Sequence, residues 1–370
     1  MLTIFTKLQI RFMNIPDKIK KILEYAIMAP SGDNCQPWRF SYSENKLDIF
    51  NDPKSDFSLY SWGQRASFLS HGALLQNIVL SSPSLGYNSR IQFFPDRNNE
   101  NHVARIIFEK ILDRKNDTIL LSISRRVTNR KIYYSKKLSD SDRISILNQS
   151  EELTKFVNLT LIEDLIKIKN IANAVSINEQ ILFENKKMHS FFYSHINWTS
   201  KEDKMKKKGF YIKTLELSGP AIVPFKLFRN WAIFNFVNKL FGFSKILAKK
   251  NSLIYTSGAA MGVISIPSEE PIDYIRAGML FQNIWLTATS LELSLQPLTG
   301  ILFLNLILRH SSQNFSTEHC VLIKKEYDII KENAGVAKSE NIVIVFRVGY
   351  SDPPSAKANR HSIDHFLIQS

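Results

Sequence analysis

The sequence predicts an α+β fold built from two related units in a single chain. Segments with the apolar spacing of helices are followed by segments that alternate as strands do. One apolar helix is also repeated 206 residues further along the chain. The 370 residues are 44% hydrophobic and 22% charged, so the chain can bury a large core and does not have a disordered composition.

The first hundred residues follow a helix–hairpin–helix–strand order. A helix is expected over residues 16–28, where the apolar positions share one face, and the breaker residues 29–32 end it. Residues 38–50 alternate as a hairpin that turns at Glu44-Asn45. Residues 70–85 are expected to form a buried helix capped by Gly86, and residues 103–108 a strand.

The repeat lies in the second of these helices. The segment from His71 to Leu80 and the segment from Ala277 to Leu286 share Gly, Leu, Gln-Asn-Ile and Leu in one register. Apolar helices resemble one another easily, but the polar core inside the register favours an internal duplication. Because both helices are so apolar, their Gln and Asn side chains are expected to need buried partners or a polar interface.

The second copy of this helix is followed by a loop and a strand. Residues 296–300 are expected to form a loop, and residues 342–348 a strongly apolar strand. The tail over residues 351–360 is rich in Pro, Ser and Lys and reads as a loop. A short turn is expected over residues 362–367.

Composition narrows the class of protein. The two cysteines, Cys35 and Cys320, are far apart and form neither a disulfide framework nor a zinc-ligand pattern. A reducing compartment such as the cytoplasm is therefore expected, with no metal site. The N-terminus lacks the apolar run and cleavage site of a secretory signal.

The net charge of +14 fits an anionic ligand such as a nucleotide, or a general surface bias. The densest basic run, residues 201–208, lies in a polar stretch without a nucleic-acid motif, so no nucleic acid partner is expected. The apolar stretch over residues 221–247 is interrupted by Lys226, Arg229 and Lys239. It is therefore expected to be amphipathic or capping rather than a membrane span.

A polar loop separates the first helix from the hairpin. It reads Ala-Pro-Ser-Gly-Asp-Asn-Cys-Gln-Pro-Trp over residues 29–38. Its Ser, Asn and Gln side chains can offer donors and acceptors to a heteroaromatic ligand. Taken alone, the same residues also describe an ordinary Asx-rich turn.

This loop resembles the signature loop of FMN-dependent nitroreductases, which reads Ala-Pro-Ser-x-x-Asn-x-Gln-Pro-Trp. All lettered positions are met, from Ala29 to Trp38. The resemblance implies two tandem, degenerate units, each with a mostly antiparallel sheet flanked by helices. It covers roughly residues 16–110, 118–140 and 250–367, and residues 150–250 lie largely outside it.

A second stretch, Ser-Arg-Arg-Val-Thr-Asn-Arg over residues 124–130, is similar to the family's phosphate-binding segment. Several guanidinium groups with a hydroxyl form a strong phosphate clamp. The spacing leaves open whether Arg125 or Arg126 takes the first position, with Thr128 and Arg130 following. Without the other motifs, a basic surface run would be the simpler interpretation.

The third stretch, Gln296 to Gly300, resembles the family loop that places backbone amides against the flavin ring. Gly300 would allow close backbone approach. Near the C-terminus, Arg360 resembles the basic residue that returns to the flavin phosphate, and Lys357 is the alternative for that role. Glu292 stands where the family has a glycine after the repeated helix.

Each unit retains only part of the family's machinery. The first has the polar loop without a preceding arginine segment, and the second has the arginine segment without such a loop. Family members are intertwined homodimers that bind FMN between subunits, so the resemblance implies a fused pseudo-dimer with a single composite site. The expected FMN ligands are Ser31, Asn34, Gln36, Arg125, Arg126, Thr128, Arg130, Leu298, Thr299, Gly300 and Arg360.

The predicted domains are an N-terminal extension at residues 1–15, a first unit at 16–115 and a second at 116–370, with a lid or insert at about 180–250. The expected function is FMN-dependent transfer of hydride from NAD(P)H to a nitro, quinone or similar acceptor. No catalytic side chain is predicted, since the flavin supplies the chemistry. The expected state is a cytoplasmic monomeric pseudo-dimer or weak homodimer.

Two alternatives belong to other classes. The first is a protein that stores or sequesters FMN with little turnover, which the large insert would suit. The second is a membrane-surface protein that uses residues 221–247 together with the basic excess. Turnover with NAD(P)H separates the enzyme from the storage protein, and liposome binding tests the membrane interpretation.

Overall fold

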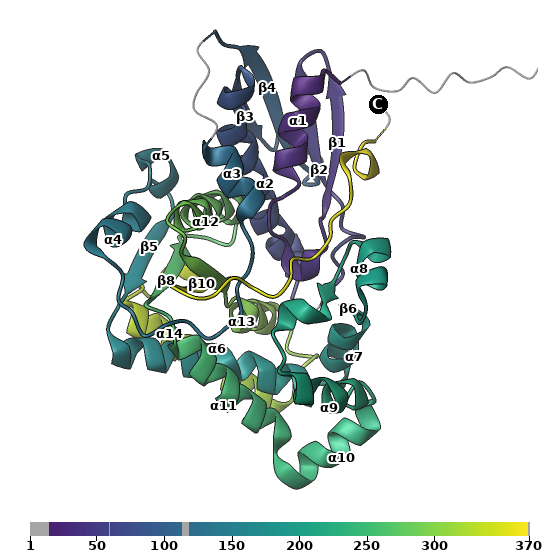
Figure 1. Ribbon diagram of the computed structural model, residues 1–370, viewed down its shortest axis with the longest axis vertical. Helices are drawn as coiled ribbons and strands as arrows, with labels where there is room; N and C mark the ends of the chain where they lie inside the picture. Colours follow the sequence, from purple (N-terminus) through teal and green to yellow (C-terminus); the bar gives the residue numbers. More distant parts are fainter. Residues whose placement is uncertain (1–14, 59, 113–117, 369–370) are drawn as a thin grey trace, which may run out of the picture.

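The computed structural model describes residues 15–58, 60–112 and 118–368, and its core is two four-stranded sheets with a pair of long helices between them (Figure 1). The architecture is α+β with antiparallel sheets flanked by helices, as the sequence predicts. The predicted N-terminal extension, except Ile15, and the predicted boundary at residues 115/116 lie outside the described residues.

The first sheet has the order β1-β2-β4-β3 and is antiparallel throughout. Its strands are β1 (Trp38–Ser43), β2 (Lys46–Asn51), β3 (Tyr87–Phe93) and β4 (His102–Lys110). The predicted β1–β2 hairpin is confirmed, and both residues of its turn, Glu44 and Asn45, have positive φ values of 47° and 63°. Two successive left-handed residues match the right-handed twist of a hairpin.

The second sheet has the order β5-β8-β10-β9 and is also antiparallel. It consists of β5 (Asn158–Ile162), β8 (Ala260–Ile266), β9 (Ser294–Pro297) and β10 (Asn341–Gly349). All residues of β8 are buried, because one apolar cluster covers each face of this sheet. Covering on both faces explains why β8 and β10 read as continuous apolar runs rather than alternating ones.

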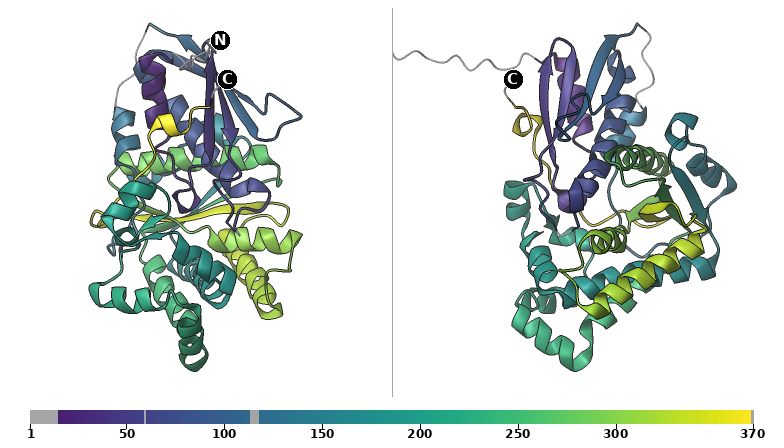
Figure 2. Two further views of the ribbon diagram at one scale, coloured as in Figure 1. Left: turned by 90° about the vertical axis from the view of Figure 1, so that its right-hand side faces the viewer. Right: turned by 180° about the vertical axis from the view of Figure 1, so that it is seen from behind.

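The two copies of the repeated helix cross at their glycines. They are α2 (Arg65–Ser81) and α12 (Pro271–Ser290), which lie between the sheets in both views of Figure 2. A Cβ on Gly72 would lie 2.0 Å from the Ile275 carbonyl oxygen, and a Cβ on Gly278 would lie 2.0 Å from that of Leu69. Gly72 and Leu69 stand 206 residues before Gly278 and Ile275. The crossing is therefore reciprocal, as at a two-fold axis.

The polar side chains of the repeat pair in the same reciprocal way. Gln76 donates to the Asn283 amide oxygen at 3.0 Å, and Gln282 donates to the Asn77 amide oxygen at 2.7 Å. The expectation that these residues need buried partners is confirmed. Each bond satisfies a buried amide that would otherwise destabilise the helix pair.

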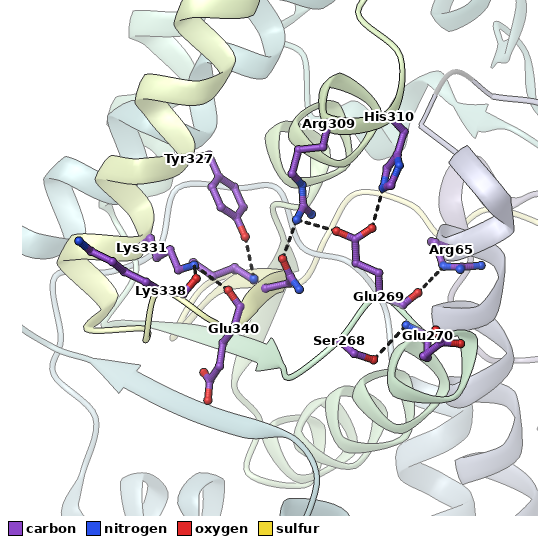
Figure 3. A network of polar contacts seen from close by, with 12 residues as sticks. Arg65, Ser268, Glu269, Glu270, Arg309, His310, Tyr327, Lys331, Lys338 and Glu340 are labelled. Carbon is purple, nitrogen blue, oxygen red and sulfur yellow. Dashed lines mark hydrogen bonds and ion pairs between the residues drawn. The ribbon is translucent and has the colours of Figure 1, made fainter.

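A second polar contact joins the two halves near the start of α2 (Figure 3). Arg65 Nε donates to the Glu269 carbonyl at 2.7 Å, and the Glu269 carboxylate pairs with Arg309 at 2.6 Å and His310 at 2.7 Å. The His310 ring stacks on Trp62 with 3.7 Å between centroids. The loop between β8 and α12 is therefore fixed to residues of the first half.

The remaining helices frame this core. The first unit carries α1 (Asp17–Ala26), and the second carries α13 (Gly300–His310) and α14 (Thr317–Ala334). The second predicted unit, residues 116–370, begins with α3 (Thr118–Arg125), α4 (Asp140–Leu147) and α5 (Glu151–Thr154). The insert predicted at about residues 180–250 contains α7 (Lys186–Ser194), α8 (Ser200–Lys206), α9 (Ile222–Leu227) and α10 (Trp231–Phe241), with the short parallel pair β6 (Ile196–Asn197) and β7 (Phe210–Tyr211). The helices α6 (Leu165–Glu184) and α11 (Phe243–Thr256) overlap its two ends.

Three sequence-based boundaries are corrected. The helix expected over residues 70–85 begins at Arg65 and ends at Ser81, and Gly86 caps the 3₁₀ turn Pro83–Leu85 instead. The loop expected over residues 296–300 is divided between β9 and the start of α13. Residues 296 and 297 belong to β9 because they pair with β10, where Phe346 and Arg347 lie opposite Pro297 and Gln296.

The C-terminal tail returns to the first sheet. It runs from β10 past the middle of the molecule to the outer edge of β1 (Figure 1), where Leu367 bridges Phe40 in parallel register. Phe366 is 1% exposed and packs on the rings of Trp38 and Phe40. The tail thereby links the second sheet to the first.

Candidate functional site

A cleft lies between the two halves of the chain, at the point where the tail crosses. It has about 570 Å³ of empty space, part of it open to solvent. Four segments line it, and they come from the polar loop, the arginine segment, the insert and the tail. The lining is Pro30, Ser31, Asn34, Arg126, Val127, Thr128, Arg130, Gly209, Phe210, Thr214, Ala356, Lys357, Ala358 and Arg360.

The polar loop is shaped by left-handed residues. Asp33, Asn34 and Gln36 have positive φ values of 47°, 53° and 52°, which cost conformational energy outside glycine. The Ser31 hydroxyl accepts a hydrogen bond from the backbone N–H of Gln36 at 3.0 Å. The conformation turns Ser31 and Asn34 toward the cleft.

Gln36 lies behind this loop rather than in the lining of the cleft. Its side-chain nitrogen donates to the Asn34 carbonyl at 3.0 Å and to the Lys207 carbonyl at 2.7 Å, and its oxygen accepts from the His361 N–H at 3.1 Å. The side chain therefore joins the loop, the insert and the tail.

Four cations converge on the cleft. Arg126 is 3% exposed, lies over the Trp285 ring at 4.5 Å and donates to the Met28 carbonyl at 2.9 Å. Arg360 donates to the carbonyls of Ile27 and Ala29, and Lys357 to that of Ser124 at 2.7 Å. Arg130 donates to the Thr214 carbonyl at 3.0 Å.

No carboxylate among the described residues forms an ion pair with any of these four cations. Burial, and then the charge of Arg360, lower the pKa of Arg126 well below its ordinary value. Burial lowers the pKa of Arg360 to about 10. Partial burial, and the charges of Arg126 and Arg360, lower the pKa of Lys357 to about 8. A buried cation such as Arg126 is costly without a counterion, so the cleft favours an anion.

Two buried polar atoms of the lining residues have no partner within the described chain. They are Arg126 Nε, a donor, and Asn34 Oδ1, an acceptor. Buried polar groups are nearly always hydrogen-bonded. A bound group with an anionic end and an N–H donor would satisfy both atoms, and the Thr128 hydroxyl adds a further donor or acceptor.

Arg125 and Arg126 have different surroundings. Arg125 ends α3, is exposed and lies 3.5 Å from the Glu292 carboxylate, away from the cleft lining. Arg126 is the first residue beyond the helix and turns into the cleft. Glu292, which stands where the family has glycine, has a positive φ of 59°. Of the two alternatives that the sequence leaves open, Arg126 is therefore the one that lines the cleft.

Leu298, Thr299 and Gly300 do not line the cleft. Leu298 is buried in the second apolar cluster. Gly300 opens α13, where a Cβ would lie 2.3 Å from the Asn178 side chain. The glycine is therefore required by close packing against α6.

The sequence gives little sign of the residues that the insert contributes. Asn34 and Gln36 both donate to the Lys207 carbonyl, and the Gly209 N–H donates to the Asp33 carbonyl at 2.9 Å. Phe210 and Thr214 complete that side of the cleft. These contacts use backbone atoms, which any residue supplies, so side-chain motifs could not reveal them. Gly209, with a φ of 82°, is the one local signal.

Acidic groups lie behind the cleft. Burial raises the pKa of Asp33 to about 6, although His195, Arg130 and Lys208 oppose the shift. Burial also raises the pKa of Glu179 to about 7, against the hydrogen bond that it accepts from the Tyr255 hydroxyl at 2.7 Å. Neither carboxyl is in the lining. Within the described residues, no three His, Cys, Asp or Glu side chains are arranged to hold a metal ion.

Two tryptophans outside the lining of the cleft pack on other rings. Trp62 stacks on His310, and Trp231 packs on His189 and Phe234. Cys35 is buried, and burial raises the pKa of its thiol well above the ordinary value. This thiol is therefore protonated and unreactive at neutral pH.

Comparison with known proteins agrees with the motif. The family model described as "Putative TM nitroreductase" matches residues 6–63, which contain the whole polar loop. A "Putative NAD(P)H nitroreductase" of Mycobacterium tuberculosis is 30% identical over 118 residues, 32% of this chain and 34% of that protein. The chain is nitroreductase-like.

The nitroreductase-like match spans about a third of that curated relative. A longer match, 20% identical over 341 residues, covers 92% of this chain and 46% of an "Uncharacterized protein" of M. tuberculosis. A solved nitroreductase with bound FMN from Desulfitobacterium hafniense aligns with 67% of this chain and 94% of that chain, at 11% identity and a TM-score of 0.35. This structural likeness is too low to add to the sequence matches.

Proposed function

We propose that this nitroreductase-like chain is an FMN-dependent oxidoreductase with one composite cofactor site. The observation that carries the proposal is the cleft itself, in which Ser31 and Asn34 of the first half face Arg126, Thr128, Arg130 and Arg360 of the second. Lys357 adds a further charge. The curated relative is named an NAD(P)H nitroreductase, so a nicotinamide donor and a small nitro, quinone or similar acceptor are the proposed substrates.

The residues of the cleft fit FMN by chemistry. Arg126, Lys357 and Arg360 would hold the phosphate, because they are clustered cations without carboxylate partners. Asn34 would offer its free amide oxygen to a ring N–H. Bound FMN would supply the transfer of hydride between donor and acceptor. Gln36 would act as a positioning residue that fixes the polar loop to Lys207 and the tail.

A comparison of FMN with riboflavin tests the phosphate site directly, since the two ligands differ only in that group. Arg126→Ala and Arg360→Ala should each weaken FMN binding by roughly 10–100-fold, the range for one lost hydrogen bond to a charged group. Riboflavin binding should change much less. Arg125→Ala is the matched control, because Arg125 is adjacent but faces Glu292. Equal losses for both ligands, or an effect of Arg125→Ala, would contradict the phosphate assignment.

The stoichiometry and the reaction are tested on the same protein. We expect about one FMN per chain after reconstitution, and bleaching of its absorbance near 450 nm by NADH or NADPH under anaerobic conditions. Two equally occupied sites per chain would exclude a single composite site. The expected state in solution is a monomer or weak homodimer, in the cytoplasm.

A storage role is the second candidate, and one feature favours it. The insert is hydrogen-bonded to the polar loop at Lys207 and Gly209, and we propose that residues 180–250 include a lid over the cofactor. A lid that stays closed would keep NAD(P)H away from the flavin. Tightly bound FMN that neither nicotinamide reduces would support storage over catalysis.

A further inference from the structure

The helix α10 presents an apolar face to solvent at one end of the molecule. Ile233, Phe236 and Leu240 follow one another at helical spacing and are exposed, with Phe236 and Leu240 at 66% and 61%. Phe241, at the end of the helix, is 68% exposed. Two aromatic and two aliphatic side chains on one short helix form a patch of the kind that marks an interaction site. These four residues are called the α10 face.

The opposite side of the helix is already packed. Phe234 is fully buried, and its ring contacts those of Phe183, His189, Phe228 and Phe243. The Asn230 side chain caps the N-terminus by accepting from the N–H groups of Ala232 and Ile233. The helix is thus held by its inner side, so the α10 face is not needed to fold it.

The chain segment that carries the α10 face is basic. No Asp or Glu occurs between Leu217 and Ser268, and six Lys and Arg do. Each of the six is exposed, and none forms an ion pair within the described chain. They are Lys226, Arg229, Lys239, Lys245, Lys249 and Lys250.

We propose that the α10 face docks on an anionic lipid surface, with its apolar side chains at the boundary of the acyl chains and the six cations at the headgroups. An interfacial helix of this kind combines an apolar face with Lys and Arg at its edges. The helix is 11 residues long, and among the described residues no helix is long and apolar enough to cross a membrane. The contact is therefore peripheral.

The position of α10 permits this contact. Figures 1 and 2 show α10 at the end of the molecule farthest from α1 and the first sheet, where it projects beyond α6 and α7. A flat bilayer can reach a projecting helix without meeting other elements. The described chain begins beside α1, at the opposite end.

A second copy of the chain is a poorer occupant. A symmetric dimer through the α10 face would bring the same basic segment of both copies together. Twelve cations without any acidic partner from this segment would repel one another. An anionic bilayer removes that repulsion and covers the same apolar atoms.

Vesicle sedimentation of the full chain tests the proposal. Vesicles of phosphatidylcholine with about 30% phosphatidylserine should bind the protein at low salt, and pure phosphatidylcholine vesicles should bind it weakly, because surface charge supplies part of the attraction. Raising the salt should release the protein as screening increases. Absence of binding to the anionic vesicles at low salt would overturn the proposal.

Paired variants separate the two contributions. Phe236→Gln with Leu240→Gln removes the apolar contact, and Lys245→Gln with Lys249→Gln removes charge. Each pair should lower the vesicle partition coefficient by about tenfold or more. The matched controls are Ile166→Gln with Val321→Gln, which are 73% and 64% exposed far from α10 in the sequence, and Lys204→Gln with Lys206→Gln on α8. Circular dichroism checks that all variants fold.

Two further measurements show whether α10 itself enters the bilayer and whether a second copy covers it instead. Lipids brominated in the acyl chains should quench the fluorescence of Phe236→Trp more strongly than that of the wild type, because position 236 lies on the exposed α10 face. Equal quenching would contradict insertion of this helix. In sedimentation velocity without lipid, we expect no dimer that depends on Phe236 and Leu240. A dimer that Phe236→Gln with Leu240→Gln abolishes would show that a second copy of the chain covers the α10 face.

Discussion

Lys357 gives the phosphate site a dependence on pH. Its ammonium lies near Arg126 and Arg360, and its pKa is lowered to about 8. The proton is therefore lost at a lower pH than in an ordinary lysine, and the attraction for a phosphate falls as pH rises through that value. The affinity of the ligand-free protein for FMN should decline from pH 7 to about pH 9, as measured by flavin fluorescence titration.

Two variants make this prediction specific. Lys357→Arg retains the charge and should bind FMN with a flatter profile over the same range. Lys357→Gln should bind more weakly at pH 7 and also with a flatter profile. An unchanged decline in Lys357→Gln would assign the pH dependence to another group.

Glu179 affects stability rather than binding. Burial raises the pKa of its carboxyl from 4.5 to about 7 in the folded chain. Between these values the folded chain binds more protons than the unfolded chain, so the contribution of Glu179 to stability falls as pH rises. Glu179→Gln removes this loss and retains an acceptor for Tyr255. The free energy of unfolding of this variant relative to wild type should rise by up to a few kcal/mol from pH 4.5 to pH 7 and then stay constant. Melting temperatures recorded across this pH range check the trend.

A change of charge alone must be separated from this effect. Glu151→Gln, at the exposed start of α5, removes one carboxylate without touching the Tyr255 contact. It should follow the wild type at each pH. A Glu179→Gln variant that does the same would show that the buried carboxyl titrates as an ordinary one.

From the sequence, residues of the cleft could be predicted only where they belong to a recognisable motif. The cleft brings together Ser31, Asn34, Arg126, Thr128, Arg130 and Arg360, which the resemblance places in one site. The choice between Arg125 and Arg126 depended on where α3 ends, which the basic run does not encode. The contribution of Lys207 and Gly209 is made by backbone atoms and has no side-chain pattern.

At the scale of elements, the crossing of α2 and α12 controls stability. Gly72→Ala would bring a Cβ within 2.0 Å of the Ile275 carbonyl oxygen, a backbone atom that cannot move alone. Helix separation would break the Gln–Asn bonds as well, so a loss of at least about 3 kcal/mol is expected. Chemical denaturation measures it. Gly278→Ala should cost a similar amount, since its environment is reciprocal.

Gly219→Ala is the control for this pair, because nothing lies within 4 Å of a Cβ at that position. Its unfolding free energy should lie within about 0.5 kcal/mol of wild type. If Gly72→Ala is equally mild, the helices can separate without cost and the close crossing is not a constraint.

Local signals predicted the elements that depend on nearby residues. The hairpin turn at Glu44-Asn45 and the periodicity of α1 are of this kind. By contrast, β9 is defined by pairing with β10, about 50 residues away, and short apolar stretches do not reveal such pairing. The start of α13 at Gly300 was missed because the family loop was expected to continue through it.

At the scale of the whole molecule, the tail connects stability to the cleft. Phe366 is buried against Trp38 and Phe40, and Arg360 lies six residues before it. Phe366→Ala should cost about 3–5 kcal/mol, as for other buried aromatics. It should also weaken FMN binding, because the segment that carries Arg360 loses its anchor. Denaturation and flavin titration measure the two effects.

Phe156→Ala serves as the control, since Phe156 is 43% exposed and lies outside the first sheet. It should leave FMN affinity unchanged. Loss of stability in Phe366→Ala with undiminished FMN affinity would show that Arg360 is positioned without the tail anchor.

The path of the tail has a consequence for how the protein is made. A ribosome synthesises Ser31 and Asn34 first, Arg126 and Arg130 about a hundred residues later, and Arg360 more than two hundred residues after those. The last cation of the cleft therefore leaves the exit tunnel well after the other residues of the cleft. A growing chain cannot hold the phosphate fully until Arg360 has emerged, so loading of a cofactor would wait for the tail.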